Sequence, residues 1–208
     1  MKLQFEHNLD YQAAAIQAVC DLFAGQEVCR TEFTVTAPRS IYTGGDAQGA
    51  LPGMAGDGVQ LGLGLAESDL GIGNRLQLDS QDLLVNLNKV QLRHGLKPSE
   101  NLTSRDFTVE METGTGKTYV YLRTVFELNQ RYGFNKFVIV VPSVAIKEGV
   151  YKSLQMMEDH FRSLYANVPF EYFLYDSSKL GQVRNFATSS HIQVMVVTVG
   201  AINKKDVN

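Results

Sequence analysis

The sequence predicts an α/β fold in which helices cover both faces of a parallel β-sheet. Three observations lead to this prediction. Apolar, β-branched runs at 136–141 and 192–199 are typical of strands buried on both faces of a sheet. Amphipathic helical patterns separate the predicted strands, and strands that alternate with helices form parallel sheets. A glycine-containing turn at 111–118 stands directly before one of these helices.

Length and composition are those of an ordinary globular protein. The chain has 208 residues, of which 44% are hydrophobic and 20% are charged. That is enough for one sizeable domain, or for one domain with an appendage. The formal net charge of −3 gives the whole chain no electrostatic footprint for nucleic acid, so we expect any DNA binding to be local.

Cysteine usage and hydropathy bear on the compartment. Cys20 and Cys29 are too few for a disulfide framework or a zinc site, and we expect both to be reduced thiols of a cytoplasmic protein. The N-terminus lacks the apolar stretch of a signal peptide, and no apolar run is long enough to span a bilayer. We therefore expect no membrane partner.

A phosphate-binding loop is predicted between Phe107 and Thr118, where an alternating apolar segment leads through a glycine-bearing turn into a helix. Gly114 and Gly116 allow the backbone to curl, so that successive N–H groups and the start of the helix face one spot. Lys117 can reach the β- and γ-phosphates, and the Thr118 hydroxyl is placed to ligate Mg²⁺. We predict nucleotide binding by Thr113, Gly114, Thr115, Gly116, Lys117 and Thr118, with Lys117 and Thr118 as the catalytic members.

One position departs from the full phosphate-loop pattern, because Met111 stands where that pattern has its first glycine. The short core Gly-Thr-Gly-Lys-Thr at 114–118 keeps the expected strand before it and helix after it. The alternative interpretation is a glycine-rich strand-to-helix turn that binds nothing. The flanking elements favour a nucleotide site.

Near the N-terminus, Asp10 is predicted to cap a helix that runs to about Ala24 and stops at Gly25. Gln12 lies in its first turn. A glutamine amide can donate to N7 of adenine and accept from its N6 amino group. The alternative is an exposed polar residue on an amphipathic helix, which the pattern alone favours; the phosphate loop downstream favours adenine recognition.

The stretch from 31 to 104 differs in character from the rest of the chain. Ten of the eighteen glycines fall between Gly44 and Gly73. Strands are predicted at 31–36, 59–65 and 75–78, followed by a helix capped by Ser80. We interpret this stretch as a small glycine-rich β/α insertion before the phosphate loop, which divides the chain into 1–30, 31–104 and 105–208.

The segment after the phosphate loop supplies the predicted sheet. Its parallel strands have their carboxyl ends at one edge, where ligands bind in such folds. The predicted elements are a helix at 119–132 ended by Gly133, a strand at 136–141, a helix from the cap Ser143 to about Tyr165, a strand at 170–175, a short helix at 179–187, a strand at 192–199, and a helix or loop from Ala201.

Several of these segments resemble those of one family. Leu-Asp-Tyr-Gln at 9–12 and Met-Glu-Thr-Gly-Thr-Gly-Lys-Thr at 111–118 resemble the adenine-reading segment and motif I of superfamily 2, DEAD/DEAH-related helicases. Residues 137–150 resemble the segment that follows motif I in the restriction (Res) subunit of type III restriction–modification enzymes. Residues 175–180 and 194–199 are similar to later segments of that subunit. The resemblance covers 1–30 and about 80–208.

The resemblance implies a partial RecA-like P-loop NTPase domain that binds ATP and Mg²⁺, within a prokaryotic, cytoplasmic Res subunit. Such a subunit is part of an ATP-dependent type III site-specific deoxyribonuclease. The partners implied are double-stranded DNA, a methyltransferase (Mod) subunit, and the rest of the Res chain with a second RecA-like lobe and a nuclease domain. Gln12 would read adenine, and residues 114–118 would hold the phosphates.

The resemblance also implies that Pro142, Ser143 and Lys147 line the track of a DNA strand, with Thr198 near it. Such phosphate contacts position DNA without reading its sequence. For Ser143, a plain helix N-cap explains the residue equally well. For Lys147, a solvated helix face is the simpler alternative.

An acidic Asp-Glu box, which in that family orients the attacking water, would come on a further strand that we do not find. We therefore expect this chain to be the N-terminal part of a Res subunit that ends before that box. We expect it to bind nucleotide without competent turnover. Two other interpretations stay open. One is a non-catalytic docking module for the methyltransferase subunit or for DNA. The other is an unrelated P-loop kinase or ATPase.

Overall fold

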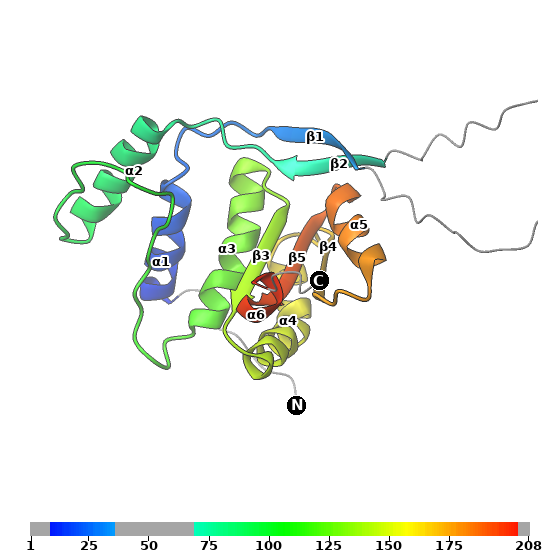
Figure 1. Cartoon of the computed structure of the whole chain (residues 1–208). Coiled ribbons are helices and arrows are strands. Elements are labelled where there is room, and N and C mark those ends of the chain that lie inside the picture. Colours follow the sequence, from blue (N-terminus) through cyan, green and yellow to red (C-terminus); the bar gives the residue numbers. More distant parts are fainter. Residues whose placement is uncertain (1–8, 36–68, 204–208) are drawn as a thin grey trace, which may run out of the picture.

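The computed structural model describes residues 9–35 and 69–203 (Figure 1). Its centre is a three-stranded sheet of β3 (Lys136–Val141), β5 (Ile192–Thr198) and β4 (Phe170–Leu174), in the order β3-β5-β4. Both pairings are parallel. The predicted parallel sheet is therefore confirmed, with each strand within one residue of its predicted bounds.

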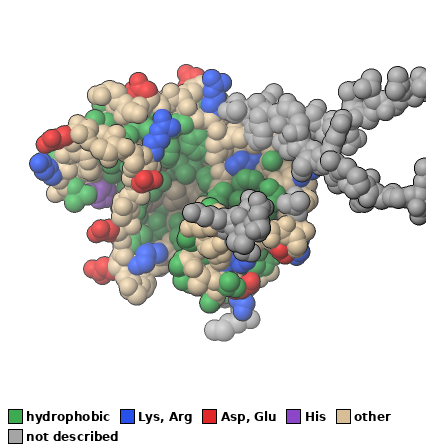
Figure 2. Space-filling model, viewed as in Figure 1, with side chains coloured by type: hydrophobic (Ala, Val, Ile, Leu, Met, Phe, Trp, Pro, Cys, Tyr) green, Lys and Arg blue, Asp and Glu red, His purple; other side chains and the backbone are tan. Residues whose placement is uncertain are grey.

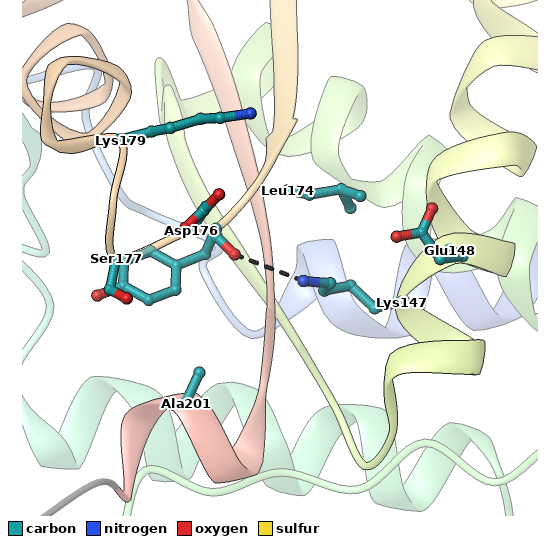
Figure 3. A pocket seen from close by; sticks show the side chains of 8 residues that line it. Lys147, Glu148, Leu174, Asp176, Ser177, Lys179 and Ala201 are labelled. Atoms are coloured by element: carbon teal, nitrogen blue, oxygen red, sulfur yellow. Dashed lines mark hydrogen bonds between the residues drawn. The ribbon is translucent and has the colours of Figure 1, made fainter.

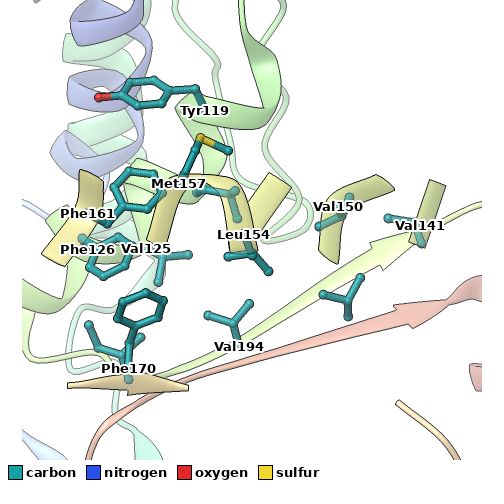
Figure 4. Close-up of a cluster of buried hydrophobic side chains, with 13 residues drawn as sticks. Tyr119, Val125, Phe126, Val141, Val150, Leu154, Met157, Phe161, Phe170 and Val194 are labelled. Atoms are coloured by element: carbon teal, nitrogen blue, oxygen red, sulfur yellow. The ribbon is translucent and has the colours of Figure 1, made fainter. Parts of the chain in front are cut away.

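Helices cover both faces of this sheet, as predicted. On one face α3 (Lys117–Tyr132) and α4 (Val144–Leu164) enclose the main core with the strands. Phe161 of α4 is fully buried and stacks on Phe126 of α3 at 4.8 Å between ring centroids (Figure 4). On the other face α5 (Leu180–Thr188) places Phe186 edge-on against Phe173 of β4, with 6.1 Å between ring centroids.

A second apolar cluster holds the N-terminal helix α1 (Asp10–Asp21) against α3. Ile16 and Cys20 of α1 pack with Val120 and Leu128 of α3. The helix α2 (Ser80–Arg93) lies on the far side of α1 (Figure 1), where the buried Asn86 amide donates to the carbonyl oxygens of Leu22 and Ala24 at 3.2 and 2.8 Å. This packing brings the start of α1 beside the start of α3.

The strands β1 (Arg30–Val35) and β2 (Asp69–Asn74) form an antiparallel ribbon. Asn74 anchors its base to the main sheet. The Asn74 side-chain oxygen accepts from the N–H groups of Asn135 and Lys136 at 2.8 and 3.0 Å, and its amide donates to the Lys136 carbonyl at 2.7 Å. The strand predicted at 59–65 lies outside the described residues.

Two predicted strands are wrong. The alternating segment that begins at Phe107, expected as the strand before the phosphate loop, forms no strand, because no described strand lies beside it to supply ladder hydrogen bonds, and Val109 is 45% exposed. The strand expected at 75–78 is also wrong, since the paired residues are 69–74. Glycines at alternate positions of β2 weaken the strand signal there.

Helix caps shift by one residue from their predicted positions. Leu9 occupies the N-cap of α1, so that Asp10 is already helical. Asp79, not Ser80, caps α2, and its side chain accepts from the N–H groups of Gln81 and Asp82, both at 2.8 Å. At the C-terminal end of α3, Gly133 takes the left-handed conformation (φ +71°) that ends the helix, as predicted.

The short helix α6 (Val199–Ile202) follows β5. The outer edge of β3 has no partner strand within the described part of the chain, and Val138 and Val140 are 47% and 50% exposed. Among the helices described, none is long and apolar enough to cross a membrane.

Candidate functional site

The predicted phosphate loop is a tight turn at the start of α3. Gly114 and Gly116 both have left-handed backbones, with φ of +84° and +81°, which a side chain would strain. Thr115 Oγ1 donates to the Glu112 carbonyl at 2.7 Å and closes the turn. Gly116 occupies the N-cap of α3 without a side-chain cap. The first N–H groups of α3 can therefore bind an anion.

Lys117 lies across this turn. Its Nζ donates to the carbonyl oxygens of Met111 and Glu112 at 2.8 and 2.7 Å. Both acceptors are neutral, and an ammonium group binds an oxyanion more strongly than a neutral carbonyl. The side chain is exposed, so a phosphate can take the place of these carbonyls.

Gln12 joins the helix α1 to the phosphate loop. Gln12 Nε2 donates to the Thr115 carbonyl at 2.9 Å, and Gln12 is only 6% exposed. The alternative of an exposed polar residue on α1 is therefore wrong. Gln12 Oε1 is buried and has no hydrogen-bond partner among the described residues. A buried acceptor of this kind favours a ligand that can donate to it, such as an adenine amino group.

The four residues predicted to contact DNA lie at the carboxyl edge of the sheet. Val141 pairs with Thr198, so Pro142 and Ser143 follow β3 beside the end of β5. Ser143 is the N-cap of α4, and its Oγ accepts from the Ile146 N–H at 3.3 Å. The capping role predicted for Ser143 is thus present in the structure.

Lys147 belongs to the same edge. Its side chain is half-buried, and Nζ donates to the Tyr175 carbonyl after β4 at 3.5 Å, at the long limit for a hydrogen bond. It therefore leans toward β4 instead of extending into solvent. In Figure 1 the start of α3 lies at the same end of the molecule as the carboxyl ends of β3 and β5. The phosphate loop and these four residues thus share one end of the sheet.

A pocket of about 370 Å³ opens beside Lys147 (Figure 3). It is lined by side chains from the start of α4, from the end of β4 with the segment after it, and from α6: Lys147, Glu148, Leu174, Tyr175, Asp176, Ser177, Lys179 and Ala201. No binding role is predicted from the sequence for residues 175–179. The signal that could have found them is their place directly after a parallel strand, at the edge where ligands bind.

Polar side chains fix α3 against α4 behind the phosphate loop. The Tyr165 hydroxyl donates to Glu127 Oε1 at 2.7 Å, and the Tyr119 hydroxyl lies 3.0 Å from His160 Nε2. Burial raises the pKa of Tyr165, and the hydrogen bond to Glu127 raises it further. Burial also raises the pKa of Tyr119, so both hydroxyls keep their protons and hold the helix pair in place.

Comparison with known proteins gives one consistent result. The family model for the Res subunit of type III restriction enzymes matches residues 7–208. The chain is 34% identical over 149 residues to the EcoP15I Res subunit of Escherichia coli, which is 62% of this chain and 15% of that protein. It is also 34% identical over 152 residues to the EcoPI Res subunit of Escherichia phage P1, which is 64% of this chain and 16% of that protein.

A third relative matches a shorter region at higher identity. The StyLTI Res subunit of Salmonella typhimurium is 52% identical over 65 residues, or 30% of this chain and 7% of that protein. The chain thus spans about a sixth or less of the length of these relatives. Because the family model covers nearly the whole chain, the protein belongs to the family of type III restriction enzyme Res subunits.

Proposed function

We propose that this chain is the ATP-binding portion of a Res subunit, with the nucleotide held by Gln12 and the phosphate loop at 113–118. The observation that carries the proposal is the contact between them. The buried Gln12 amide donates to the Thr115 carbonyl at 2.9 Å, between two left-handed glycines and beside an open helix N-terminus. One amide N–H and the unpartnered oxygen of Gln12 remain for an adenine edge.

The backbone and two side chains of the phosphate loop would contribute separately to ATP binding. The backbone N–H groups of 114–118 bind phosphate oxygens, and Lys117 exchanges two carbonyl acceptors for the β- and γ-phosphates. The Thr118 hydroxyl, at the start of α3, would hold Mg²⁺. Bound Mg²⁺ neutralises charge on the phosphate oxygens.

The parent enzyme would couple ATP hydrolysis to movement or switching on double-stranded DNA and to DNA cleavage. It would do so together with a methyltransferase (Mod) subunit and the rest of the Res chain. Pro142, Ser143, Lys147 and Thr198 would line the DNA strand, which their common place at the carboxyl edge supports. We propose that the 208 residues alone bind ATP without competent turnover, since the acidic box expected for catalysis is not recognised in the sequence.

Calorimetric titration with Mg-ATP and Mg-GTP tests this proposal. Lys117→Ala removes a charge-assisted contact of about 1.5–3 kcal/mol, so we expect about 10- to 150-fold weaker ATP binding. Gln12→Ala should remove the preference for ATP over GTP. The control Lys152→Ala changes an exposed lysine of α4 and should bind ATP normally.

Two results would contradict the proposal. Absence of ATP binding by the unaltered chain rejects the nucleotide site. Robust ATP hydrolysis by the unaltered chain, abolished by Lys117→Ala, rejects the claim that the chain alone lacks turnover.

A second candidate function is a docking module for the methyltransferase subunit. It is favoured by exposed apolar side chains on three elements that meet at the carboxyl edge, β3, the start of α4, and α6; these are Val138, Val140, Val144, Ile146, Val199 and Ile202. Figure 2, which is viewed as Figure 1 is, shows hydrophobic side chains at the surface of the face turned toward the reader. Capture of the methyltransferase subunit that survives Lys117→Ala and is lost in Ile146→Asp would support this function.

A further inference from the structure

The central sheet has an open edge along β3 (Figure 1). In the described part of the chain, β5 pairs with one side of β3 and no strand pairs with the other side. We propose that this edge is an interface between two copies of the chain, which pair antiparallel through β3 and join their two sheets. No residue of the proposed nucleotide site takes part, so the interface does not depend on the proposed function.

The contacts of Asn74 identify the backbone groups of β3 that face outward. The Asn74 side chain accepts from the Lys136 N–H at 3.0 Å and donates to the Lys136 carbonyl at 2.7 Å. The Asn135 carbonyl, by contrast, accepts from the Gln193 N–H beside it at 2.7 Å, so it faces β5. Successive residues of a strand turn their N–H and C=O groups to opposite sides. The alternate residues from Lys136 onward therefore face away from β5.

Two valines occupy the outward positions that follow Lys136. No described strand lies beside Val138 and Val140 to pair with their N–H and C=O groups, and these residues are 47% and 50% exposed. An open edge is a template for pairing with another chain unless a charged side chain or a proline protects it. Lys136 is the one charged residue of β3, and its ammonium group donates to the Ser189 carbonyl of the same chain. The edge at the two valines therefore has no such protection from β3 itself.

The two ends of this open stretch select one register for the pair. Both backbone groups of Lys136 already have a partner, and Pro142, which follows β3 at the next outward position, has no N–H to donate. In an antiparallel pair centred on Ile139, Val138 of each copy faces Val140 of the other and exchanges two hydrogen bonds with it. Lys136 then faces Pro142, so the residues that cannot pair lie opposite each other. The edge is therefore complementary to a second copy of itself.

The side chains at this interface also match. Val138 and Val140 lie on the same face of β3, because side chains alternate between the faces of a strand. Residues that face each other in an antiparallel pair place their side chains side by side on one face, so both valines of each copy would form one apolar cluster. The contact is small beside that of a permanent dimer. We therefore expect a dimer whose population depends on the protein concentration.

Sedimentation velocity of the unaltered chain between about 10 μM and 1 mM tests the proposal. We expect the sedimentation coefficient to rise with concentration from that of a monomer toward that of a dimer. The double variant Val138→Lys/Val140→Lys places like charges opposite each other, so it should stay monomeric over this range. The control Val85→Lys changes a valine of α2 with similar exposure (43%) and should dimerise normally. Urea unfolding of each variant checks that it is folded.

A cysteine at the predicted symmetry axis tests the register. Ile139 would face its own copy at a non-hydrogen-bonded position, where the two Cα atoms are about 4.5 Å apart and within the range of a disulfide. Ile139→Cys should therefore link two chains under mild oxidation, as seen by non-reducing gel electrophoresis. Val138→Cys should link poorly, because it faces Val140 of the second copy. The unaltered chain, which contains Cys20 and Cys29, gives the background.

Three results would overturn the interface. The first is an unaltered chain that stays monomeric up to about 1 mM. The second is a dimer that persists in the double lysine variant, and the third is stronger cross-linking of Val138→Cys than of Ile139→Cys. Capture of the methyltransferase subunit by a chain that stays monomeric would assign this edge to that partner instead. A chain that dimerises but does not bind Mg-ATP would overturn the proposed nucleotide function alone.

Discussion

The two glycines of the phosphate loop allow a sharp test of the Gln12 contact. Both have left-handed backbones, so an alanine at either position should cost about 1–2 kcal/mol of stability. They differ in their surroundings. A Cβ on Gly116 would lie 2.6 Å from Gln12 Nε2, whereas a Cβ on Gly114 would meet nothing within 4 Å.

The Gly116→Ala variant must therefore displace the buried Gln12 amide and break its bond to Thr115. A hydrogen bond contributes about 0.5–1.5 kcal/mol, and leaving a buried polar group unsatisfied adds to the loss. We expect Gly116→Ala to lower the free energy of unfolding by about 2–4 kcal/mol and Gly114→Ala by about 1–2 kcal/mol. At this chain length the extra loss corresponds to about 2–8 °C in Tm.

Urea unfolding of Gly114→Ala, Gly116→Ala, Gln12→Ala and the Gln12→Ala/Gly116→Ala pair measures these terms. Because alanine at position 12 removes the clash, the pair should show a favourable coupling of about 1–2 kcal/mol. Equal losses for the two glycine variants, or simple additivity of the Gln12 and Gly116 changes, would refute the close contact.

Two further predictions concern titrating groups. The pKa of Glu158 is lowered, first by the hydrogen bond that it accepts from the Tyr172 hydroxyl at 2.7 Å and then by the one from Arg162. The Glu158 carboxylate therefore stabilises the fold at pH values above its ordinary pKa. This stabilisation is lost as the pH falls through the lowered pKa. Tyr172→Phe should therefore reduce the stability lost between neutral and acidic pH, as measured by urea unfolding at each pH; an unchanged loss contradicts this. Burial raises the pKa of Cys20 to about 11, whereas Cys29 is half-buried. Iodoacetamide at mildly alkaline pH should label Cys29 in the native protein and Cys20 only after unfolding, and native labelling of Cys20 would contradict the packing of α1.

The sheet and its helices were predictable because their signals are local. The β-branched run at 136–141 and Gly133 before it define a strand and a helix end without reference to other segments. The strand expected directly before the phosphate loop shows the limit of such signals. Alternation of apolar residues describes a strand only when a neighbour supplies hydrogen bonds, and that neighbour is not visible in a local pattern.

The site was predictable to a similar extent. The residue types at 113–118 match the chemistry of phosphate binding, so the sequence alone singles them out as a candidate phosphate loop. The bond between Gln12 and Thr115 joins residues 103 positions apart, and only the packing of α1 on α3 creates it. The pocket beside Lys147 likewise combines three separate segments, none of which has a motif for it.

The anchored ribbon has a consequence for how this protein tolerates changes in length. Val35 and Asp69 face each other across β1 and β2, and Asn74 ties the ribbon to the start of β3. The chain therefore leaves and re-enters the body at neighbouring points. A fluorescent reporter or an affinity tag inserted between these two residues would therefore have both of its ends held at neighbouring points of the ribbon.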